Sequence, residues 1–239
     1  MSSGATQKVA MLMGGLSAER EVSLVSGREC AAALRDEGFE VIEVDAGADL
    51  AQRLVDVRPD VAFNALHGRW GEDGVVQGLL EWLKIPYTHS GVLASALGMD
   101  KQRSKKAFVE AGLPVVESKI ATKSDAASQF LLPTPYVIKP NNEGSSVGIH
   151  FVQQGASSLP DLGDDLPDTL MIERFVPGRE LTTSVLDNQA LAVTDIITEK
   201  WYDYAAKYHP GGSRHVVPAN VPDGISAACL DYALRAHQA

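Results

Sequence analysis

Short apolar runs alternate with longer segments of helical periodicity over the first hundred residues of the chain. A short apolar run predicts a buried strand, whereas apolar residues three and four positions apart predict an amphipathic helix. On these criteria we expect strands at residues 9–13, 39–44 and 61–66, and helices at about 17–38, 50–57 and 74–84. A short apolar stretch at 85–87 would add an edge strand. Strict alternation of strands and helices predicts a parallel sheet with helices on its faces.

From residue 115 onward the pattern changes to closely spaced β-type runs with few helices. These runs lie at 115–121, 136–139, 147–152, 169–175, 180–186 and 191–198. Helices are expected at 101–111, at 124–130 and from 223 to the end, and the polar segments 155–168 and 199–218 are predicted to be loops. Neighbouring strands without a helix between them favour antiparallel pairing. We therefore predict an α+β region that follows a domain boundary near residues 95–100.

Two polar stretches follow strands of the predicted parallel sheet, at the edge where open α/β sheets bind their ligands. The first runs from Gly14 to Glu21 and contains Glu19, and the second runs from His67 to Gly74. Each has a simpler interpretation. Glu19 would complement the dipole of the following helix, and His67 would be an ordinary hydrogen-bonded loop histidine. Two such loops at one crevice favour a ligand site over these alternatives.

A third candidate site is the turn between two β-type runs at residues 139–148, which reads Lys-Pro-Asn-Asn-Glu-Gly-Ser-Ser-Val-Gly. Lys139 stands at the end of the first run, and Ser145 and Ser146 supply hydroxyl and backbone N–H groups in the turn. This combination suits a polyanion such as a nucleoside triphosphate. It matches neither the P-loop nor the dinucleotide-binding fingerprint, and an ordinary hairpin turn is the alternative interpretation.

Composition limits the class of protein. The 239 residues include 45% hydrophobic and 22% charged residues, which is typical of a soluble globular chain. The net charge of −10 argues against a general nucleic-acid partner. Cys30 and Cys229 lack disulfide or metal-site spacing, the amino-terminal residues do not resemble a signal peptide, and no apolar run is long enough to span a membrane. We expect a cytoplasmic protein without membrane or nucleic-acid partners.

The motifs of the chain also form an ordered set. They are Gly14-Gly15-x-Ser17-Ala18-Glu19-Arg20-Glu21-Val22-Ser23, Ala65-Leu66-His67-Gly68, Gly71-Glu72-Asp73-Gly74, Met99-Asp100-Lys101-x-Arg103-Ser104-Lys105, Lys139-Pro140, Glu143-Gly144-Ser145-Ser146-Val147-Gly148 and Tyr202-Asp203-Tyr204-x-Ala206-Lys207-Tyr208. In this order and spacing, the chain resembles the D-alanine–D-alanine ligases of the ATP-grasp superfamily from about residue 8 to its end. The resemblance implies a Rossmann-like α/β domain at 1–97, a central ATP-grasp α+β domain at 98–178, and the start of a carboxyl-terminal ATP-grasp domain at 179–239 with a lid loop at 199–218.

The resemblance further implies a reaction and a nucleotide site. ATP would phosphorylate one D-alanine, and the amine of a second D-alanine would attack the D-alanyl phosphate to give D-alanyl-D-alanine for peptidoglycan synthesis. By resemblance, the nucleotide is bound by Lys101, Lys139, Ser145, Ser146, Val147, Glu173, Arg174, Val176, Glu180 and Lys207. Among these, the lysines and the turn would face the phosphates. Glu173 and the backbone of Arg174 and Val176 would face the adenine, and Glu180 would face the ribose.

A second implied group would act on the amino acids. It comprises Glu19, His67, Ser145, Lys207 and Tyr208. Glu19 would hold the ammonium group of the first D-alanine, and His67 would lie beside the substrate carboxyl groups. Ser145 and Tyr208 would link the phosphate-binding turn, the lid and Glu19, and tyrosine at position 208 resembles the form that makes a peptide rather than a D-lactate ester. The family also implies a possible homodimer.

One part of the family pattern has no match in residues 1–239. The Arg-x-Asp and Glu-x-Asn segments that bind magnesium in the family are not found there, so we assign no metal ligands and expect those for Mg²⁺ beyond residue 239. We therefore expect a truncated, weakly active or inactive form of the ligase. The alternatives are a non-catalytic ATP- or D-alanine-binding remnant, or another ATP-grasp carboxylate–amine ligase such as a D-alanine–D-lactate ligase.

Overall fold

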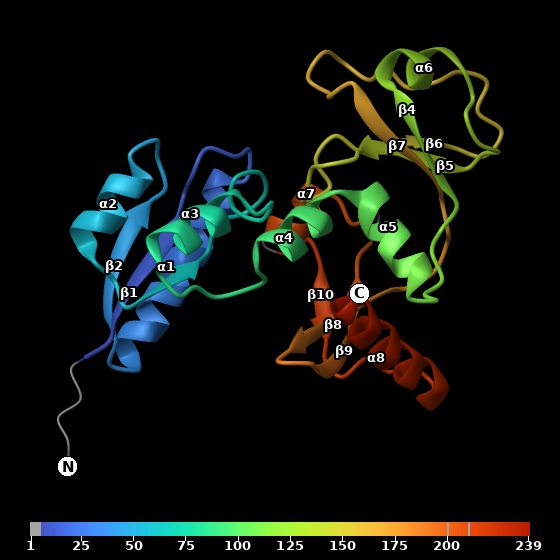
Figure 1. Ribbon diagram of the computed structural model, residues 1–239. Helices are drawn as coiled ribbons and strands as arrows, with labels where there is room; N and C mark the ends of the chain where they lie inside the picture. The colour runs from blue at the N-terminus through green and yellow to red at the C-terminus, as the bar shows by residue number, and fades with distance from the viewer. Residues whose placement is uncertain (1–5, 200, 210) are drawn as a thin grey trace. The chain divides into compact units, whose positions relative to one another are not determined.

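The computed structural model describes residues 6–199, 201–209 and 211–239, and it divides into two compact units, Met1–Asp100 and Lys101–Ala239 (Figure 1). Each unit has its own sheets. The sequence-based division at residues 97 and 178 stays a prediction. The position of the second predicted boundary coincides with a change of sheet, because β7 (Thr169–Arg174) and β8 (Glu180–Leu186) belong to different sheets.

The first unit contains the predicted parallel sheet, with strand order β2-β1-β3. Its strands are β1 (Lys8–Met13), β2 (Glu40–Asp45) and β3 (Val61–Asn64). The prediction that the third strand runs to residue 66 is wrong. The side chain of Asn64 accepts a hydrogen bond from the Leu66 N–H at 3.2 Å, so the chain turns away from the sheet there. The predicted edge strand at 85–87 is reduced to one parallel bridge between Ala62 and Tyr87.

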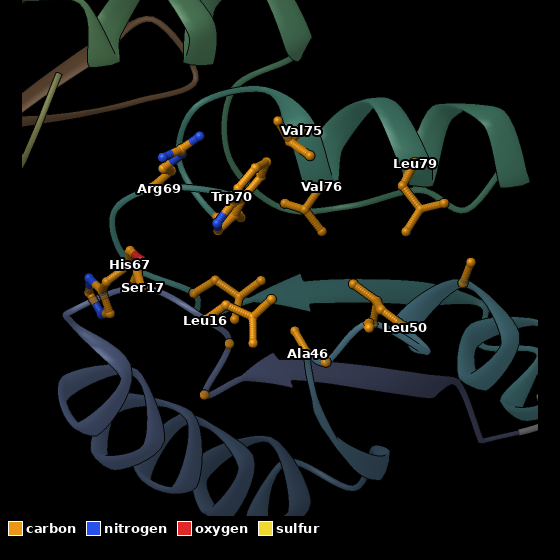
Figure 2. Close-up of a pocket in the computed structure, with 17 residues that line it drawn as sticks. Leu16, Ser17, Ala46, Leu50, His67, Arg69, Trp70, Val75, Val76 and Leu79 are labelled. Carbon is orange, nitrogen blue, oxygen red and sulfur yellow. Dashed lines mark hydrogen bonds between the residues drawn. The ribbon is translucent and has the colours of Figure 1, made fainter.

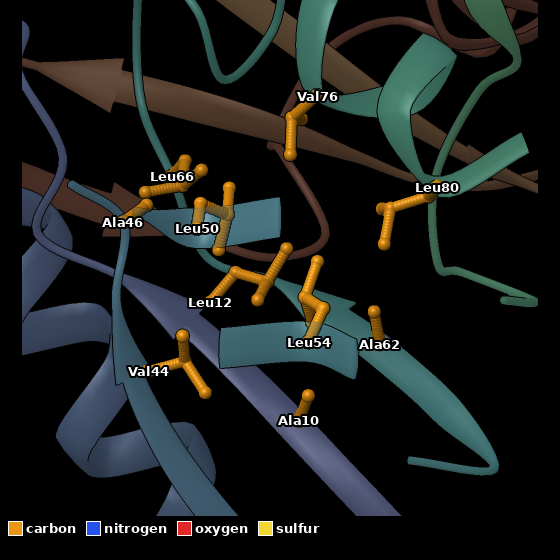
Figure 3. Close-up of a cluster of buried hydrophobic side chains, with 10 residues drawn as sticks. All are labelled: Ala10, Leu12, Val44, Ala46, Leu50, Leu54, Ala62, Leu66, Val76 and Leu80. Carbon is orange, nitrogen blue, oxygen red and sulfur yellow. The ribbon is translucent and has the colours of Figure 1, made fainter. Parts of the chain in front are cut away.

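Alternate residues of β1 face two separate cores, which explains why the whole strand is apolar. On one face, Ala10 and Leu12 join a cluster of buried side chains from α2 (Leu50–Val57) and α3 (Val75–Leu83) (Figure 3). On the other face, Val9, Met11 and Met13 pack with residues of α1 (Arg20–Asp36). The sheet is therefore covered on both faces. A further helix, α4 (Val92–Met99), was not predicted, because the segment has small residues and no helical stripe.

The second unit begins with α5 (Lys101–Glu110) and contains a four-stranded antiparallel sheet of order β4-β7-β5-β6. Its other strands are β4 (Ser118–Thr122), β5 (Tyr136–Pro140) and β6 (His150–Val152), and α6 (Lys123–Ser128) packs on one face. Tyr136, Ile138 and Ile172 lie in the core on that face. Since side chains alternate along a strand, Lys139 and Glu173 lie on the opposite face.

Two strand predictions in this unit extend too far. The predicted strands at 115–121 and 147–152 begin at Ser118 and His150 instead. In the second case the turn is longer than expected because Ser145, Ser146 and Gly148 have positive φ angles of 50°, 59° and 68°. Such angles are incompatible with extended backbone. The predicted antiparallel hairpin itself is confirmed, because Ile138 pairs with His150.

The remainder of the second unit is a three-stranded antiparallel sheet of order β10-β9-β8, on which α8 (Asp223–Gln238) packs. Its strands are completed by β9 (Gln189–Ile197) and β10 (Arg214–Val216). The prediction that 199–218 is one loop is wrong, because the segment contains α7 (Tyr204–Tyr208) and β10. The Asp203 side chain caps α7 by accepting a hydrogen bond from the Ala206 N–H at 2.8 Å.

Candidate functional site

The residues predicted to bind the triphosphate line one cavity of about 210 Å³ in the second unit. The lining residues are Lys101, Lys139, Pro140, Glu143, Gly144, Ser145, Ser146, Val147, Ile149 and Lys207. They come from the start of α5, the end of β5, the β5–β6 turn and α7. Three lysines around one open cavity form a site for a multiply charged anion. Lys207 also lies over the ring of Tyr202, with Nζ 5.2 Å from the ring centroid.

The β5–β6 turn is held in its conformation by contacts to the segment around α7. Ser145 and Ser146 both have left-handed backbone angles, which are uncommon for residues other than glycine. The Ser145 hydroxyl lies 2.6 Å from the Tyr208 hydroxyl, and the Ser146 hydroxyl donates to the Tyr202 carbonyl at 3.1 Å. Strained backbone of this kind collects at ligand-binding sites. The two hydroxyl contacts therefore fix the turn against α7 with its serine groups at the cavity.

Lys101 is anchored to the end of β5 by Asn141, which is buried. The Lys101 N–H donates to the Asn141 carbonyl at 3.2 Å, and the Asn141 side chain accepts from the Gln102 N–H at 3.0 Å. The Lys101 ammonium donates to the carbonyl of Glu143 at 2.5 Å. Since these bonds join the first turn of α5 to the β5–β6 turn, they bring Lys101 and Lys139 to the same cavity although 38 positions separate them in the sequence.

Lys139 forms an ion pair with Glu173, and a second lysine completes the cluster. The ammonium groups of Lys139 and Lys105 bind Oε2 and Oε1 of Glu173, respectively, with 2.6 Å between Lys105 Nζ and Oε1. Burial raises the pKa of Glu173, but the hydrogen bonds and charges of the two lysines outweigh burial and hold that pKa below its ordinary value. The carboxylate is therefore ionised at neutral pH. Sequence reasoning missed Lys105, because four basic residues in six positions are usually a solvated helix face.

The second unit also contains a larger cavity, of about 800 Å³. Ile149 lines both cavities. Three aromatic side chains line the larger cavity: Phe151, Phe175 and Trp201. The ring centroids of Phe151 and Phe175 lie 4.9 Å apart, and each lies 6.3 Å from the ring centroid of Trp201. Flat apolar walls of this kind suit a planar heteroaromatic base. Phe151 and Phe175 were not among the predicted site residues, although both fall at the ends of predicted strands.

The predicted adenine and ribose residues divide between this cavity and the sheet beside it. Val176 and Glu180 line the larger cavity, whereas Glu173 and Arg174 are not among its lining residues. Glu173 is instead bound by the two lysines, and the backbone N–H of Arg174 donates to the Glu117 carbonyl at 3.0 Å. The roles of these four residues toward a nucleotide stay predictions.

In the first unit, the two polar loops at the carboxyl ends of β1 and β3 meet. The Ser17 hydroxyl donates to the His67 carbonyl at 2.8 Å and accepts from the Glu19 N–H at 3.1 Å. Glu19 is only 3% exposed, and its carboxylate lies so close to Gly68 that a Cβ atom at position 68 would overlap it. Nε2 of His67 lies 3.3 Å from the Ser26 hydroxyl. The structure thus brings Glu19 and His67 together, as the two-loop prediction requires.

Beside these loops lies an apolar cavity of about 230 Å³ (Figure 2). Figure 2 shows Val75, Val76 and Leu79 of α3 facing Leu16 and Leu50 across it, with Ser17 and His67 at one end. It occupies the carboxyl-terminal edge of the parallel sheet, where ligands of such sheets bind.

An ion pair missed by the sequence analysis fixes the Gly14-Gly15 turn. Arg20 Nη1 donates to Asp45 Oδ1 at 2.7 Å and to the Gly15 carbonyl at 3.0 Å, and the Gly15 N–H donates to Asp45 Oδ1 at 3.3 Å. The hydrogen bond from Arg20 is the main reason why the pKa of Asp45 lies below its ordinary value. A side chain at Gly14 would overlap the Asp45 carboxylate, so only glycine fits this φ of +72°. The network holds the first residues of α1 in place directly beside Glu19.

A parallel α/β unit, combined with a unit of antiparallel sheets whose strand-end lysine and serine-bearing turn line an anion-sized cavity, defines the ATP-grasp class of proteins. A family sequence model described as D-ala D-ala ligase C-terminus matches residues 93–239, and one described as D-ala D-ala ligase N-terminus matches residues 43–90. The chain belongs to the D-alanine–D-alanine ligase family.

Individual relatives agree with this assignment. The chain is 66% identical to the D-alanine–D-alanine ligase of Dinoroseobacter shibae over 238 residues, which cover 100% of this chain and 77% of that protein. It is also 66% identical over 239 residues to the ligase of Ruegeria pomeroyi, of which it spans 78%. Crystal structures of D-alanine–D-alanine ligase from Bacillus anthracis, one of them complexed with ATP, match with a TM-score of 0.77 at 29% and 26% identity. Both matches cover 98% of this chain, and 78% and 77% of the respective structures.

Within residues 6–199, 201–209 and 211–239, no three His, Cys, Asp or Glu side chains are grouped so that they could hold a metal ion. Among the helices of these same residues, none is both long and apolar enough to cross a membrane.

Proposed function

We propose that the chain catalyses the ATP-dependent joining of two D-alanines to D-alanyl-D-alanine through a D-alanyl phosphate. The observation that carries this proposal is the lysine-lined cavity, which shares the lining residue Ile149 with the aromatic-walled cavity. A nucleoside triphosphate has a flat base at one end and a multiply charged chain at the other, and the two adjoining cavities match these ends. The high identity to ligases that carry this activity in their names supports the same substrates here.

The lysines supply the main electrostatic requirement of the first step. Transfer of the γ-phosphoryl group to a carboxylate brings negative charges together, and catalysis of phosphoryl transfer consists largely of positioning and charge stabilisation. Lys101 and Lys139 approach from α5 and β5, and Lys207 approaches from α7. The backbone N–H groups of Ser145 and Ser146 would add donors to the phosphate oxygens, whereas the N–H of Val147 donates to the Gly144 carbonyl at 3.1 Å. The base and ribose would lie in the larger cavity, with Glu180 toward the ribose hydroxyls.

Glu19 and His67 are the proposed contacts of the amino-acid substrates. A D-alanine zwitterion needs a carboxylate for its ammonium group, and Glu19 is a buried carboxylate at the loop that carries His67. A buried carboxylate attracts a cationic partner more strongly than an exposed one, because water screens it less. In the second step, the amine of the other D-alanine attacks the D-alanyl phosphate, and phosphate leaves as the peptide bond forms.

The acyl phosphate must be kept from water, because water would hydrolyse it. The segment from residue 199 to 218 is proposed as the cover, with α7 as its rigid part. Through its hydrogen bond to Ser145, Tyr208 would couple the position of α7 to that of the phosphate-binding turn. Magnesium would reduce the repulsion between the phosphate groups. The described residues hold no cluster of His, Cys, Asp or Glu that could bind it, so no protein ligand is proposed for it. By analogy with the family, we also propose that the chain forms a homodimer.

The experiment is a ligation assay on the 239-residue chain with ATP, Mg²⁺ and D-alanine. Inorganic phosphate would be measured continuously and D-alanyl-D-alanine would be identified by mass spectrometry. We expect phosphate and dipeptide in equal amounts, formed slowly in keeping with the weakly active form predicted from the sequence, and neither product with L-alanine. A parallel reaction with D-alanine and D-lactate tests the ester-forming alternative. Binding of ATP without dipeptide would contradict the proposal and favour a non-catalytic nucleotide-binding protein.

A further inference from the structure

Lys105 binds Oε1 of the Glu173 carboxylate, whereas Lys139 binds Oε2 of the same group. The side chains of Lys105 and Glu173 are each 17% exposed, and that of Lys139 is 18% exposed. Lys105 also donates to the Val116 carbonyl at 2.5 Å, which fixes the direction of its ammonium group. The three charged groups therefore form a shielded cluster in which two cations share one carboxylate.

The charge balance of this cluster determines what Lys139 can offer to a ligand. One carboxylate neutralises one ammonium group. If Glu173 faced Lys139 alone, the pair would carry no net charge, and an incoming polyphosphate would compete with the carboxylate for the same N–H donors. With Lys105 present, the cluster carries one net positive charge. Because water screens these groups little, that charge acts strongly on a neighbouring anion.

The two lysines of this cluster line different cavities. Lys139 lines the lysine-lined cavity, whereas Lys105 is not among its lining residues and instead borders a separate cavity formed by α5 and β4. Lys105 thus cannot substitute for Lys139 at the ligand. Its ammonium group can only donate to Oε1 of Glu173 and compensate the charge of that carboxylate.

We propose that Lys105 is a positioning residue for nucleotide binding, which compensates the charge of Glu173 so that Lys139 is available to the phosphate groups of ATP. The inference rests on the proposed function of the cavity. Its alternative is a purely structural role, in which Lys105 only fastens α5 to the segment before β4. Removing one partner of a buried ion pair destabilises a protein in either case, so loss of stability alone does not distinguish the two roles.

A double-mutant comparison separates them. We would measure the Kd for ATP by calorimetry, with the full chain, in Lys105→Met, Glu173→Gln and the double variant. The adjacent exposed lysine in Lys106→Met is the matched control, because it removes the same charge from the same helix. Any direct effect of Glu173→Gln on the adenine cancels, because Lys105→Met is compared within each background.

We expect Lys105→Met to raise the Kd for ATP about tenfold in the parent and less than about twofold in the Glu173→Gln background. Lys106→Met should change the Kd less than about twofold, and Lys105→Arg should retain most of the affinity. The KM for D-alanine should be unchanged. If Lys105→Met does not fold, Lys105→Gln keeps a donor for the Val116 carbonyl and gives the same comparison.

An equal loss of affinity in both backgrounds, or no loss in the parent, overturns the inference and leaves the proposed ATP site standing. A parent chain that binds no ATP overturns both. The two failures are therefore distinguishable in one set of titrations.

Discussion

The hydroxyl groups of Ser145 and Tyr208 lie 2.6 Å apart and join the β5–β6 turn to α7. We expect Tyr208→Phe to lower kcat for ligation about tenfold, because the turn loses the contact that holds it against α7 when the cover closes. Tyr204→Phe is the control, since it removes a hydroxyl from the same short helix while keeping the ring contact with Tyr208 at 4.8 Å. Equal turnover of the Tyr208→Phe variant and the parent would contradict the proposed link.

Lys139→Ala should lower turnover by at least about a hundredfold, as loss of a preorganised charge-stabilising group typically does. The substitution also leaves Glu173 with Lys105 as its remaining lysine partner. Lys119→Ala removes an exposed lysine from β4 of the same sheet and should leave turnover within about twofold. Steady-state phosphate release measures both variants. An unchanged kcat in Lys139→Ala would refute the phosphate role.

Gly68→Ala should raise the KM for D-alanine about tenfold, because the added methyl group would overlap the Glu19 carboxylate and position 68 has a φ of +67°. The KM for ATP should not change, since the cavities proposed for the nucleotide lie in the second unit. Gly78→Ala is the matched control: it lies within α3 with open space around it and should keep or slightly raise the melting temperature. If Gly68→Ala raised both KM values alike, general misfolding rather than displacement of Glu19 would be the cause.

Asp45→Asn should lower the melting temperature at neutral pH by an amount that decreases in acid. The hydrogen bond from Arg20 lowers the pKa of Asp45 in the folded chain, against about 3.9 when unfolded. Stability from the pair is therefore fully present above about pH 4 and is lost as pH falls through the lower, folded pKa. The effect should be modest, because Arg20 and Asp45 are 42% and 45% exposed.

Melting curves of the parent and Asp45→Asn at pH 7, 5 and 3 test this prediction. The difference between the two curves should be smaller at pH 3 than at pH 7. Asp36→Asn, at an exposed position at the end of α1, should match the parent throughout. A difference between the parent and Asp45→Asn that stays constant with pH would exclude the ion pair as its source.

The sequence predicts the fold well where one physical signal dominates. β1 is recognised because buried residues on both of its faces make an unbroken apolar run. Prediction fails where a single side chain redirects the backbone. Asn64 ends β3 early through its bond to the Leu66 N–H, and the left-handed serines in the β5–β6 turn delay β6. No hydrophobic pattern records such contacts.

The site shows the same division. The lysines and serines of the phosphate cavity are found from motif order, because the same set of residues recurs in one sequence arrangement. Lys105 stands in one of these motifs but receives no role from it, and the aromatic wall of Phe151 and Phe175 is not predicted at all. Their roles arise from tertiary contacts between elements far apart in the sequence, such as the Lys105–Glu173 pair across 68 positions.

Ile149 lines both cavities of the second unit, so one aliphatic side chain stands where they adjoin. A bulkier residue at this position would separate the aromatic-walled cavity from the lysine-lined one. The protein could then accommodate a nucleoside or an inorganic polyphosphate, but not the two covalently joined. A preference for a complete nucleotide over either of its halves would therefore depend on the size of a single aliphatic side chain that itself cannot make a polar contact.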